Sequence, residues 1–227
     1  TTINDPSEYF DAVLFTGNTV NIPVDMNMRP DLFWLKSKTQ TYSHLIYDTN
    51  RQSDGTSMPT GDANMYSKLS ADTTDDEDDN NADGLVQTST GFIVDGDGQA
   101  IGEANQGANN MVAWCWKANG GTTTTNDASA TSVGNVDSVY QANTTAGFSI
   151  VTFDLTSDSG DKTIAHGLGQ APDVIIFKNR DDGRNWAIHH HTQTPPQYMT
   201  FTTDAVASSD NFNNSTRLFQ LSTIPSF

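Results

Sequence analysis

Residues 29–36, Arg29-Pro30-Asp31-Leu32-Phe33-Trp34-Leu35-Lys36, decide the fold because residues 171–178 repeat them as Ala171-Pro172-Asp173-Val174-Ile175-Ile176-Phe177-Lys178. In both copies a proline and an aspartate precede a run of apolar residues. A proline is tolerated at the first position of a strand, where its missing N–H is not needed. The repeated motif therefore predicts one strand in each of two related units.

The repeat extends on both sides of this motif. The other matching segments are 10–15 with 148–153, 45–47 with 187–189, 66–72 with 198–204, and 91–93 with 218–220. Two copies of one structural unit are the simplest explanation. We expect a first unit over residues 1–118, a linker rich in Thr, Ser, Gly and Asn over 119–146, and a second, shorter unit over 147–227.

The composition favours strands over helices. The chain of 227 residues has 25 Asp but only 3 Glu, together with 30 Thr and 6 Lys. Threonine is branched at Cβ and prefers strands, whereas Asp bonds to nearby backbone in turns. The predicted fold is all-β, with two related antiparallel units that resemble β-sandwiches or jelly rolls.

The second unit lacks one predicted strand. Residues 112–117, Val-Ala-Trp-Cys-Trp-Lys, predict a closing strand for the first unit, and the second unit has no counterpart. A sheet edge without a partner tends to pair with another strand. Either the chain is cut short, or the second unit completes its sheet with a strand from the other unit or another subunit.

The net charge excludes one class of partner. There are 28 acidic and 11 basic side chains, which gives a formal net charge of −17. A nucleic-acid-binding surface needs clustered Lys and Arg, so we expect no nucleic acid partner. No apolar run approaches the roughly 18 residues of a membrane span, and no signal peptide is visible at the N-terminus. The single cysteine, Cys115, lies in an apolar segment that predicts a buried, inert thiol.

Two clusters contain residue types that can bind metals. Five consecutive acidic residues could provide the oxygen ligands that Ca²⁺ prefers, although a solvated loop is the favoured interpretation: Asp75, Asp76, Glu77, Asp78 and Asp79. In His189-His190-His191, the first and third side chains would share one side of a strand and could bind a transition metal. The segment 95–99, Asp-Gly-Asp-Gly-Gln, departs from the pattern of a calcium loop and favours a hairpin turn.

Trp114 and Trp116 form the candidate ligand-binding pair. They would share one face of the closing strand, where they either fill the core or form an exposed platform for sugar rings. Packing in the core is the favoured interpretation of the two tryptophans, and glycan binding is the more specific hypothesis.

The sequence contains no convincing catalytic group. It has no nucleophile elbow beside His166, and Asp31 and Asp173 occupy equivalent positions next to proline, which favours turn capping over catalysis. We therefore expect a protein that is not an enzyme and has no cofactor, apart from the possible divalent cation.

Several segments resemble repeat domains in virion proteins of marine and cyanobacterial tailed phages. The matching segments are 9–18, 30–36 and 112–118 in the first unit, and 145–151 and 166–173 in the second. Residues 21–27, which replace the His-Gly-Leu-Gly turn of the second unit, and the acidic run depart from the pattern.

This resemblance implies a structural protein on the exterior of the virion. The expected role is a tail-fibre or capsid-attached fibre module for attachment to the host surface. Its implied partners are itself, as a homo-oligomer with a trimer as the first expectation, other virion proteins, and a host-surface glycan. The alternatives are a head-decoration or cement protein and, less favoured, a polysaccharide depolymerase.

Overall fold

The computed structural model describes residues 3–18, 20–51, 63–65, 67–78, 84–94, 108–155, 162–192 and 198–201. Almost all of its regular structure is antiparallel strand, which confirms the all-β prediction. The strands of the first predicted unit are β1 (Phe10–Thr16), β2 (Ile22–Asp25), β3 (Leu32–Ser37), β4 (Leu45–Asp48), β5 (Ala63–Met65), β6 (Leu69–Ser70), β7 (Leu85–Thr88), β8 (Gly91–Val94) and β9 (Asn110–Trp116). The remaining elements are the 3₁₀ helix η1 (Pro6–Glu8), β10 (Thr124–Asn126), α2 (Ala128–Thr131), β11 (Ser138–Asn143), β12 (Phe148–Phe153), β13 (Val174–Phe177) and β14 (Ala187–His190).

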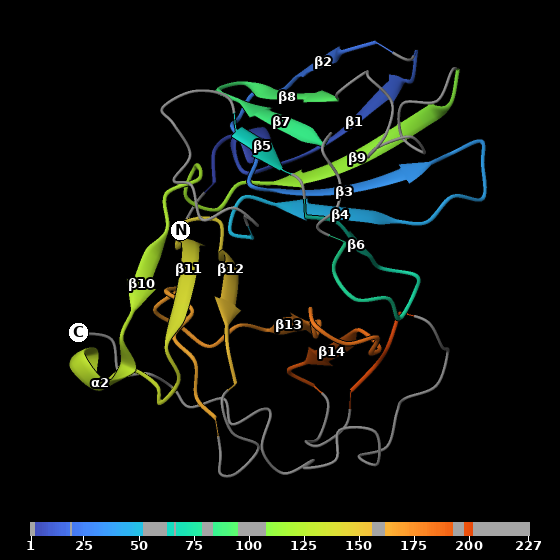
Figure 1. Cartoon of the computed structure of the whole chain (residues 1–227). Helices are drawn as coiled ribbons and strands as arrows, with labels where there is room; N and C mark the ends of the chain where they lie inside the picture. The colour runs from blue at the N-terminus through green and yellow to red at the C-terminus, as the bar shows by residue number, and fades with distance from the viewer. Residues whose placement is uncertain are drawn as a thin grey trace.

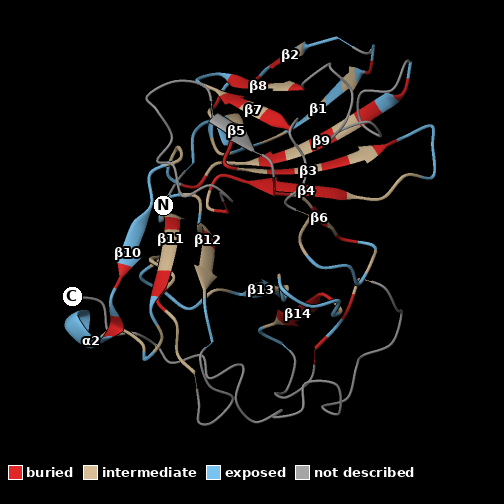
Figure 2. Cartoon of the chain, in the orientation of Figure 1, coloured by how far each residue is buried: buried red, intermediate tan, exposed pale blue. Residues whose placement is uncertain are grey.

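The first unit is a sandwich of two sheets (Figure 1). One sheet has the strand order β1-β9-β3-β4-β6, and the other has the order β2-β8-β7-β5. Buried residues alternate with partly exposed ones along β3 and β9, which Figure 2 colours red and tan, as expected for strands with one face in the core. The largest fully buried side chains of this core are Tyr47, Phe33, Phe92, Leu35 and Leu85.

The sequence repeat is also a structural repeat in one hairpin. In β3–β4, Leu32 lies opposite Asp48, and in β13–β14, Val174 lies opposite His190. Both members of the second pair follow those of the first by 142 positions, so the two hairpins share one register. The same backbone bond closes both hairpins: Thr49 N–H donates to Asp31 O at 2.9 Å, and His191 N–H donates to Asp173 O at 2.8 Å.

The structure differs from the predicted linker over residues 119–146. These residues contain β10, α2 and β11, and the two strands join β12 in a three-stranded sheet of order β10-β11-β12. The composition predicted a linker because the buried side chains of β11 are polar, namely Ser138 and Gln141. The Gln141 amide donates to Thr49 Oγ1 at 2.9 Å, and the Ser138 hydroxyl donates to Ala165 O at 3.2 Å. Hydrogen bonds thus hold a sheet that has few apolar residues to bury.

The carboxylate of Asp31 joins several parts of the first unit and is fully buried. Its Oδ2 accepts hydrogen bonds from the backbone N–H of Ala118 at 2.7 Å and of Gly120 at 2.8 Å, directly after β9. Its Oδ1 accepts from the hydroxyl of Thr49 at 3.1 Å and the amide of Gln87 at 3.2 Å. The prediction of a capping role is therefore confirmed for Asp31, which fastens β3 to β4, β7 and the end of β9.

The equivalent Asp173 has a different environment. Its side chain is 82% exposed, and its carboxylate contacts His191 Nδ1 at 3.4 Å. Within the described part of the chain, β13 pairs only with β14, so no strand corresponds to β9 on its other side. The two aspartates differ because, among the described strands, only Asp31 has a closing strand whose end it can bind.

A second hydrophobic cluster joins the two predicted units. It consists of Ile46, Leu69, Ala71 and Trp186, with Trp34 and Phe201 packed against it. The indole N–H of Trp186 donates to Ser70 O at 2.8 Å, which anchors the start of β14 on β6. The outer face of the five-stranded sheet therefore packs against side chains that follow β13 in the chain.

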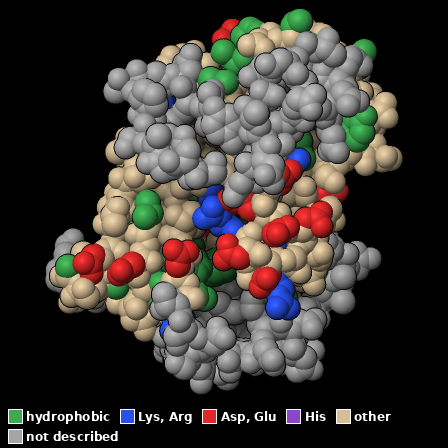
Figure 3. All heavy atoms as spheres, in the orientation of Figure 1, with side chains coloured by type: hydrophobic (Ala, Val, Ile, Leu, Met, Phe, Trp, Pro, Cys, Tyr) green, Lys and Arg blue, Asp and Glu red, His purple; other side chains and the backbone are tan. Residues whose placement is uncertain are grey.

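The described surface carries many acidic side chains. In Figure 3 they cross the middle of the visible face, with a few Lys and Arg among them. The described helices are all too short and too polar to form a membrane span.

We predict that Asp31→Asn destabilises the protein, whereas Asp173→Asn does not. An asparagine amide at the first position cannot accept four hydrogen bonds, so buried donors lose their partner, and we expect a loss of about 3 kcal/mol in the free energy of unfolding. The exposed Asp173 provides the matched control, with a change within about 0.5 kcal/mol. Urea unfolding followed by tryptophan fluorescence measures both values. Equal losses of stability for the two substitutions would contradict the structural role of the buried Asp31 carboxylate.

Candidate ligand-binding site

Trp114 and Trp116 lie on the outer face of the five-stranded sheet. In β9 the buried residues are Met111, Ala113 and Cys115, and the tryptophans alternate with them at intermediate exposure. The favoured interpretation from the sequence, packing in the sandwich core, is therefore wrong for both. Burial raises the pKa of the Cys115 thiol well above its usual range, which agrees with an inert cysteine.

Trp116 belongs to an aromatic group with Phe10 and Phe148. The Trp116 ring lies 4.9 Å from that of Phe10 and stacks on that of Phe148 at 6.2 Å, between ring centroids. Phe10 is 40% exposed, so part of this aromatic group faces solvent. These three residues come from β1, β9 and β12, which places the aromatic group where the sandwich meets the three-stranded sheet.

Trp114 has a different role from Trp116. Its ring packs edge-on against Trp34, with the centroids 6.4 Å apart, and Trp34 packs in the same way against Phe201 at 5.3 Å. The indole N–H of Trp34 donates to His44 Nδ1 at 2.9 Å, and burial lowers the pKa of His44, so this imidazole stays neutral and can accept the bond. Trp114 thus borders the contact between the units.

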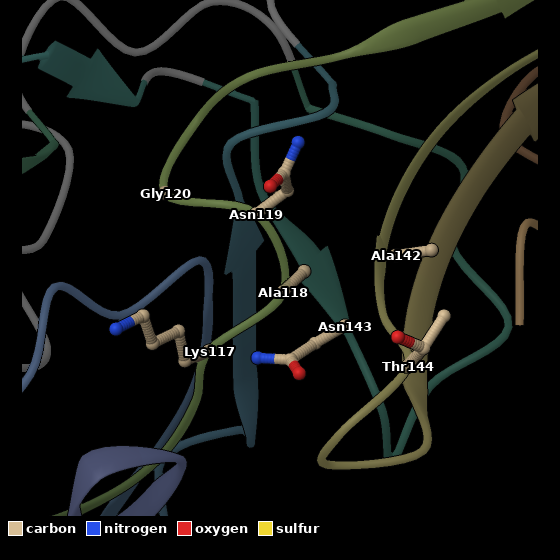
Figure 4. A pocket seen from close by; sticks show the side chains of 7 residues that line it. All are labelled: Lys117, Ala118, Asn119, Gly120, Ala142, Asn143 and Thr144. Atoms are coloured by element: carbon tan, nitrogen blue, oxygen red, sulfur yellow. The ribbon is translucent and has the colours of Figure 1, made fainter.

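A pocket of about 310 Å³ lies next to the aromatic group (Figure 4). Its lining residues follow β9 on one side and form the β11–β12 turn on the other: Lys117, Ala118, Asn119, Gly120, Ala142, Asn143 and Thr144. Asn143 lies opposite Phe148 in the β11–β12 pair, so the two side chains share one face of that hairpin. The aromatic group and the pocket are therefore neighbours.

The walls of the pocket are held in place from behind. Asp31 binds the N–H groups of Ala118 and Gly120, and Asn143 Oδ1 accepts hydrogen bonds from Thr145 N–H at 3.1 Å and Ala146 N–H at 3.0 Å. Hydrogen bonds within the protein therefore hold both loops that line the pocket.

Three polar groups of the pocket keep their capacity for hydrogen bonding. Within the described part of the chain, no partner contacts the Lys117 ammonium, the Asn143 amide N–H₂ or the Thr144 hydroxyl. Together they offer donors and one hydroxyl acceptor beside an aromatic surface. A ligand with several hydroxyl groups and an apolar face fits this combination.

The acidic run does not form a metal site in its described residues. Glu77 is nearly buried, and its carboxylate binds Arg180 through two bonds of 2.7 and 2.5 Å and Arg51 through one of 2.7 Å. Asp78 pairs with Lys68 at 3.4 Å, and Asp79 lies outside the described residues. Glu77 is therefore an anchor between the units, because Arg180 follows β13 and Arg51 follows β4.

The first and third histidines of the cluster also lie in different environments. His189 is only 2% exposed, whereas the side chain of His191 is 51% exposed and lies beside Asp173. Across the described ranges, no three His, Cys, Asp or Glu side chains are grouped so that they could bind a metal ion. The candidate turn at residues 95–99 lies outside the described residues.

Comparison with known proteins identifies the family. The model of a domain of unknown function, DUF7483, matches residues 5–224. The chain belongs to the DUF7483 family. No curated protein and no solved structure matches this DUF7483 chain.

Sequence reasoning identified only part of the candidate site in this DUF7483 protein. Trp116 was predicted, but Phe10, Phe148 and the pocket were not. A pairing of residues 10–16 with 110–116 would have placed Phe10 opposite Trp116. Nothing in the sequence indicates that the 143–148 turn meets the end of β9, because that contact depends on packing between sheets.

We predict that Glu77→Gln destabilises this DUF7483 protein by about 3 kcal/mol at pH 7, because two arginines lose the charge of their shared partner. Although burial acts to raise the pKa of Glu77, its bonds to Arg180 and Arg51 outweigh burial and hold the pKa below the usual 4.5. This stabilisation is complete above the usual pKa and disappears as the pH falls through the lowered value.

The difference in unfolding free energy between wild type and Glu77→Gln should therefore shrink on acidification below about 4.5. Urea unfolding at a series of pH values measures it. Asp76→Asn, which removes an exposed carboxylate one residue away, is the matched control and should change stability little. A difference that stays constant down to about pH 2 would contradict the role of the Glu77 charge.

Proposed function

We propose that this DUF7483 protein is a non-enzymatic structural protein of a phage virion, in a tail-fibre or capsid-attached fibre module that adheres to host-surface glycan. The observation that carries the proposal is the partly exposed aromatic group beside a polar pocket. The virion setting follows from the resemblance of residues 9–18, 30–36 and 112–118, together with 145–151 and 166–173, to phage repeat domains.

The chemistry of the pocket suits a sugar. The C–H face of a pyranose ring packs on aromatic carbon, as the partly exposed Phe10 ring permits. Lys117, Asn143 and Thr144 can bind the ring hydroxyls from the pocket side. The pocket is an open depression of about 310 Å³, so it could accept one or two sugar units of a chain that continues into solvent.

The lining of the pocket favours binding over cleavage. Hydrolysis of a glycosidic bond by the usual mechanism needs two carboxyl groups on either side of that bond. The pocket is lined by neutral residues and one lysine, and no Asp or Glu is among them. The carboxylate of Asp31, which binds two N–H groups of the pocket wall, is fully buried and accepts hydrogen bonds from four donors.

A glycan array with the purified full chain tests this proposal. We expect binding to a defined set of glycans, and a loss of about tenfold or more in affinity for Phe10→Ala and Lys117→Ala, since each removes one good contact. Lys38→Ala removes an exposed lysine far from the pocket along the sheet and is the matched control.

Two results would contradict the proposal. The first is binding that Phe10→Ala and Lys117→Ala leave unchanged. The second is the release of oligosaccharide from a bound polysaccharide, measured as new reducing ends, because that would make the protein an enzyme.

A further inference from the structure

The edge of β13 is the repeat equivalent of an edge that binds a strand in the first unit. There, β3 lies between β4 and β9, with Leu32 opposite Trp116 and Trp34 opposite Trp114. In the second unit, β13 keeps the register with β14 but has no described strand on its other side. Among the described residues, therefore, nothing takes beside β13 the position that β9 fills beside β3.

The backbone of this edge has no strand partner among the described residues. His191 N–H donates to Asp173 O, so Asp173 directs its carbonyl toward the β14 side. Because antiparallel strands alternate, Val174 and Ile176 direct their N–H and C=O groups away from β14. Apart from their pairing with β14, neither residue makes a hydrogen bond in the described part of the chain.

The side chains at this edge are apolar and exposed. Val174 is 47% exposed and Ile176 is 49% exposed, and the two share one face because they are two positions apart. Their equivalents in the first unit, Leu32 and Trp34, are less exposed because β9 lies beside them. An added strand would cover the same area in the second unit.

The carboxylate of Asp173 marks the end of this edge. Asp31, its equivalent, binds two backbone N–H groups of the turn that follows β9. The Asp173 side chain is 82% exposed, and within the described part of the chain its carboxylate contacts only the side chain of His191, so it can accept N–H groups in the same way. The chain that follows β13 is held on the first unit. The backbone N–H of Glu77 donates to Arg180 O at 2.8 Å, and the Glu77 carboxylate binds the Arg180 side chain.

We propose that the β13 edge binds an antiparallel strand from a partner protein. This strand carries bulky apolar side chains at alternate positions, opposite Val174 and Ile176, and is followed by a turn whose N–H groups bind Asp173. The first unit specifies this chemistry, because β9 and residues 118–120 provide those features to the same hairpin. The four residues of β13 make the interface short, and its affinity is therefore moderate.

Charge favours another protein over a second copy as the partner. Each chain has a net charge of −17, so two copies repel each other, and a neutral or basic partner does not meet this repulsion. The inference rests on the repeat and on the open edge, and it is independent of the proposed glycan binding.

A peptide with the sequence of residues 108–121, with Cys115→Ser to prevent oxidation, is the probe. Added to the full chain, it should bind in a fluorescence anisotropy titration and slow hydrogen exchange at the amides of Val174 and Ile176. Ile176→Lys should weaken binding by about ten- to a hundredfold, since it removes one buried apolar side chain. Leu155→Lys, a change at a residue that is 46% exposed outside the strands, is the matched control and should bind normally.

Two further comparisons test the roles of the peptide tryptophans and of Asp173. A peptide in which Trp114 and Trp116 are both replaced by Ala should bind more weakly than the parent peptide. Asp173→Asn should weaken binding, whereas Asp182→Asn, which removes another exposed carboxylate, should not.

Three results would overturn the proposal. The first is no binding of the parent peptide. The second is faster exchange over residues 112–116 on addition of the peptide, which would show displacement of β9 instead of binding at β13. The third is protection of Val174 and Ile176 that grows with protein concentration without peptide, which would make a second copy the partner.

Discussion

The buried carboxylate of Asp31 is the interaction on which the structure depends. A carboxylate without water is stable only if donors surround it, and Asp31 has four, from the end of β9, from Thr49 after β4 and from Gln87 on β7. The same bonds fix the 118–120 turn that forms one wall of the candidate pocket. Packing of the sandwich and the shape of the candidate pocket therefore both depend on Asp31.

The repeat shows what happens when this interaction lacks its partners. The hairpins β3–β4 and β13–β14 share one register, yet Asp31 is fully buried and Asp173 is mostly exposed. The difference comes from the strand beside the hairpin, because β9 lies next to β3 and no described strand lies next to β13. The second unit is anchored elsewhere, through Glu77 with Arg180 and through Trp186 on β6.

The sequence predicted the fold where local pattern and repetition agree. The Pro-Asp motif located β3 and β13, and the predicted closing strand over residues 112–117 corresponds to most of β9. It failed for β10 and β11, since β11 buries Ser138 and Gln141, and hydrogen bonds replace the apolar pattern. The sequence also did not predict the ion pairs of Glu77, because its partner Arg180 lies 103 positions away and leaves no local pattern.

We propose that the protein lies on the outside of a virion, with its aromatic group and pocket available to a host surface. Electron cryo-microscopy of intact particles that contain this protein tests it most directly. The account predicts density for the chain on the particle exterior, with Phe10 and Lys117 facing away from the particle. Density inside the shell, or a pocket covered by a neighbouring virion protein, would contradict it.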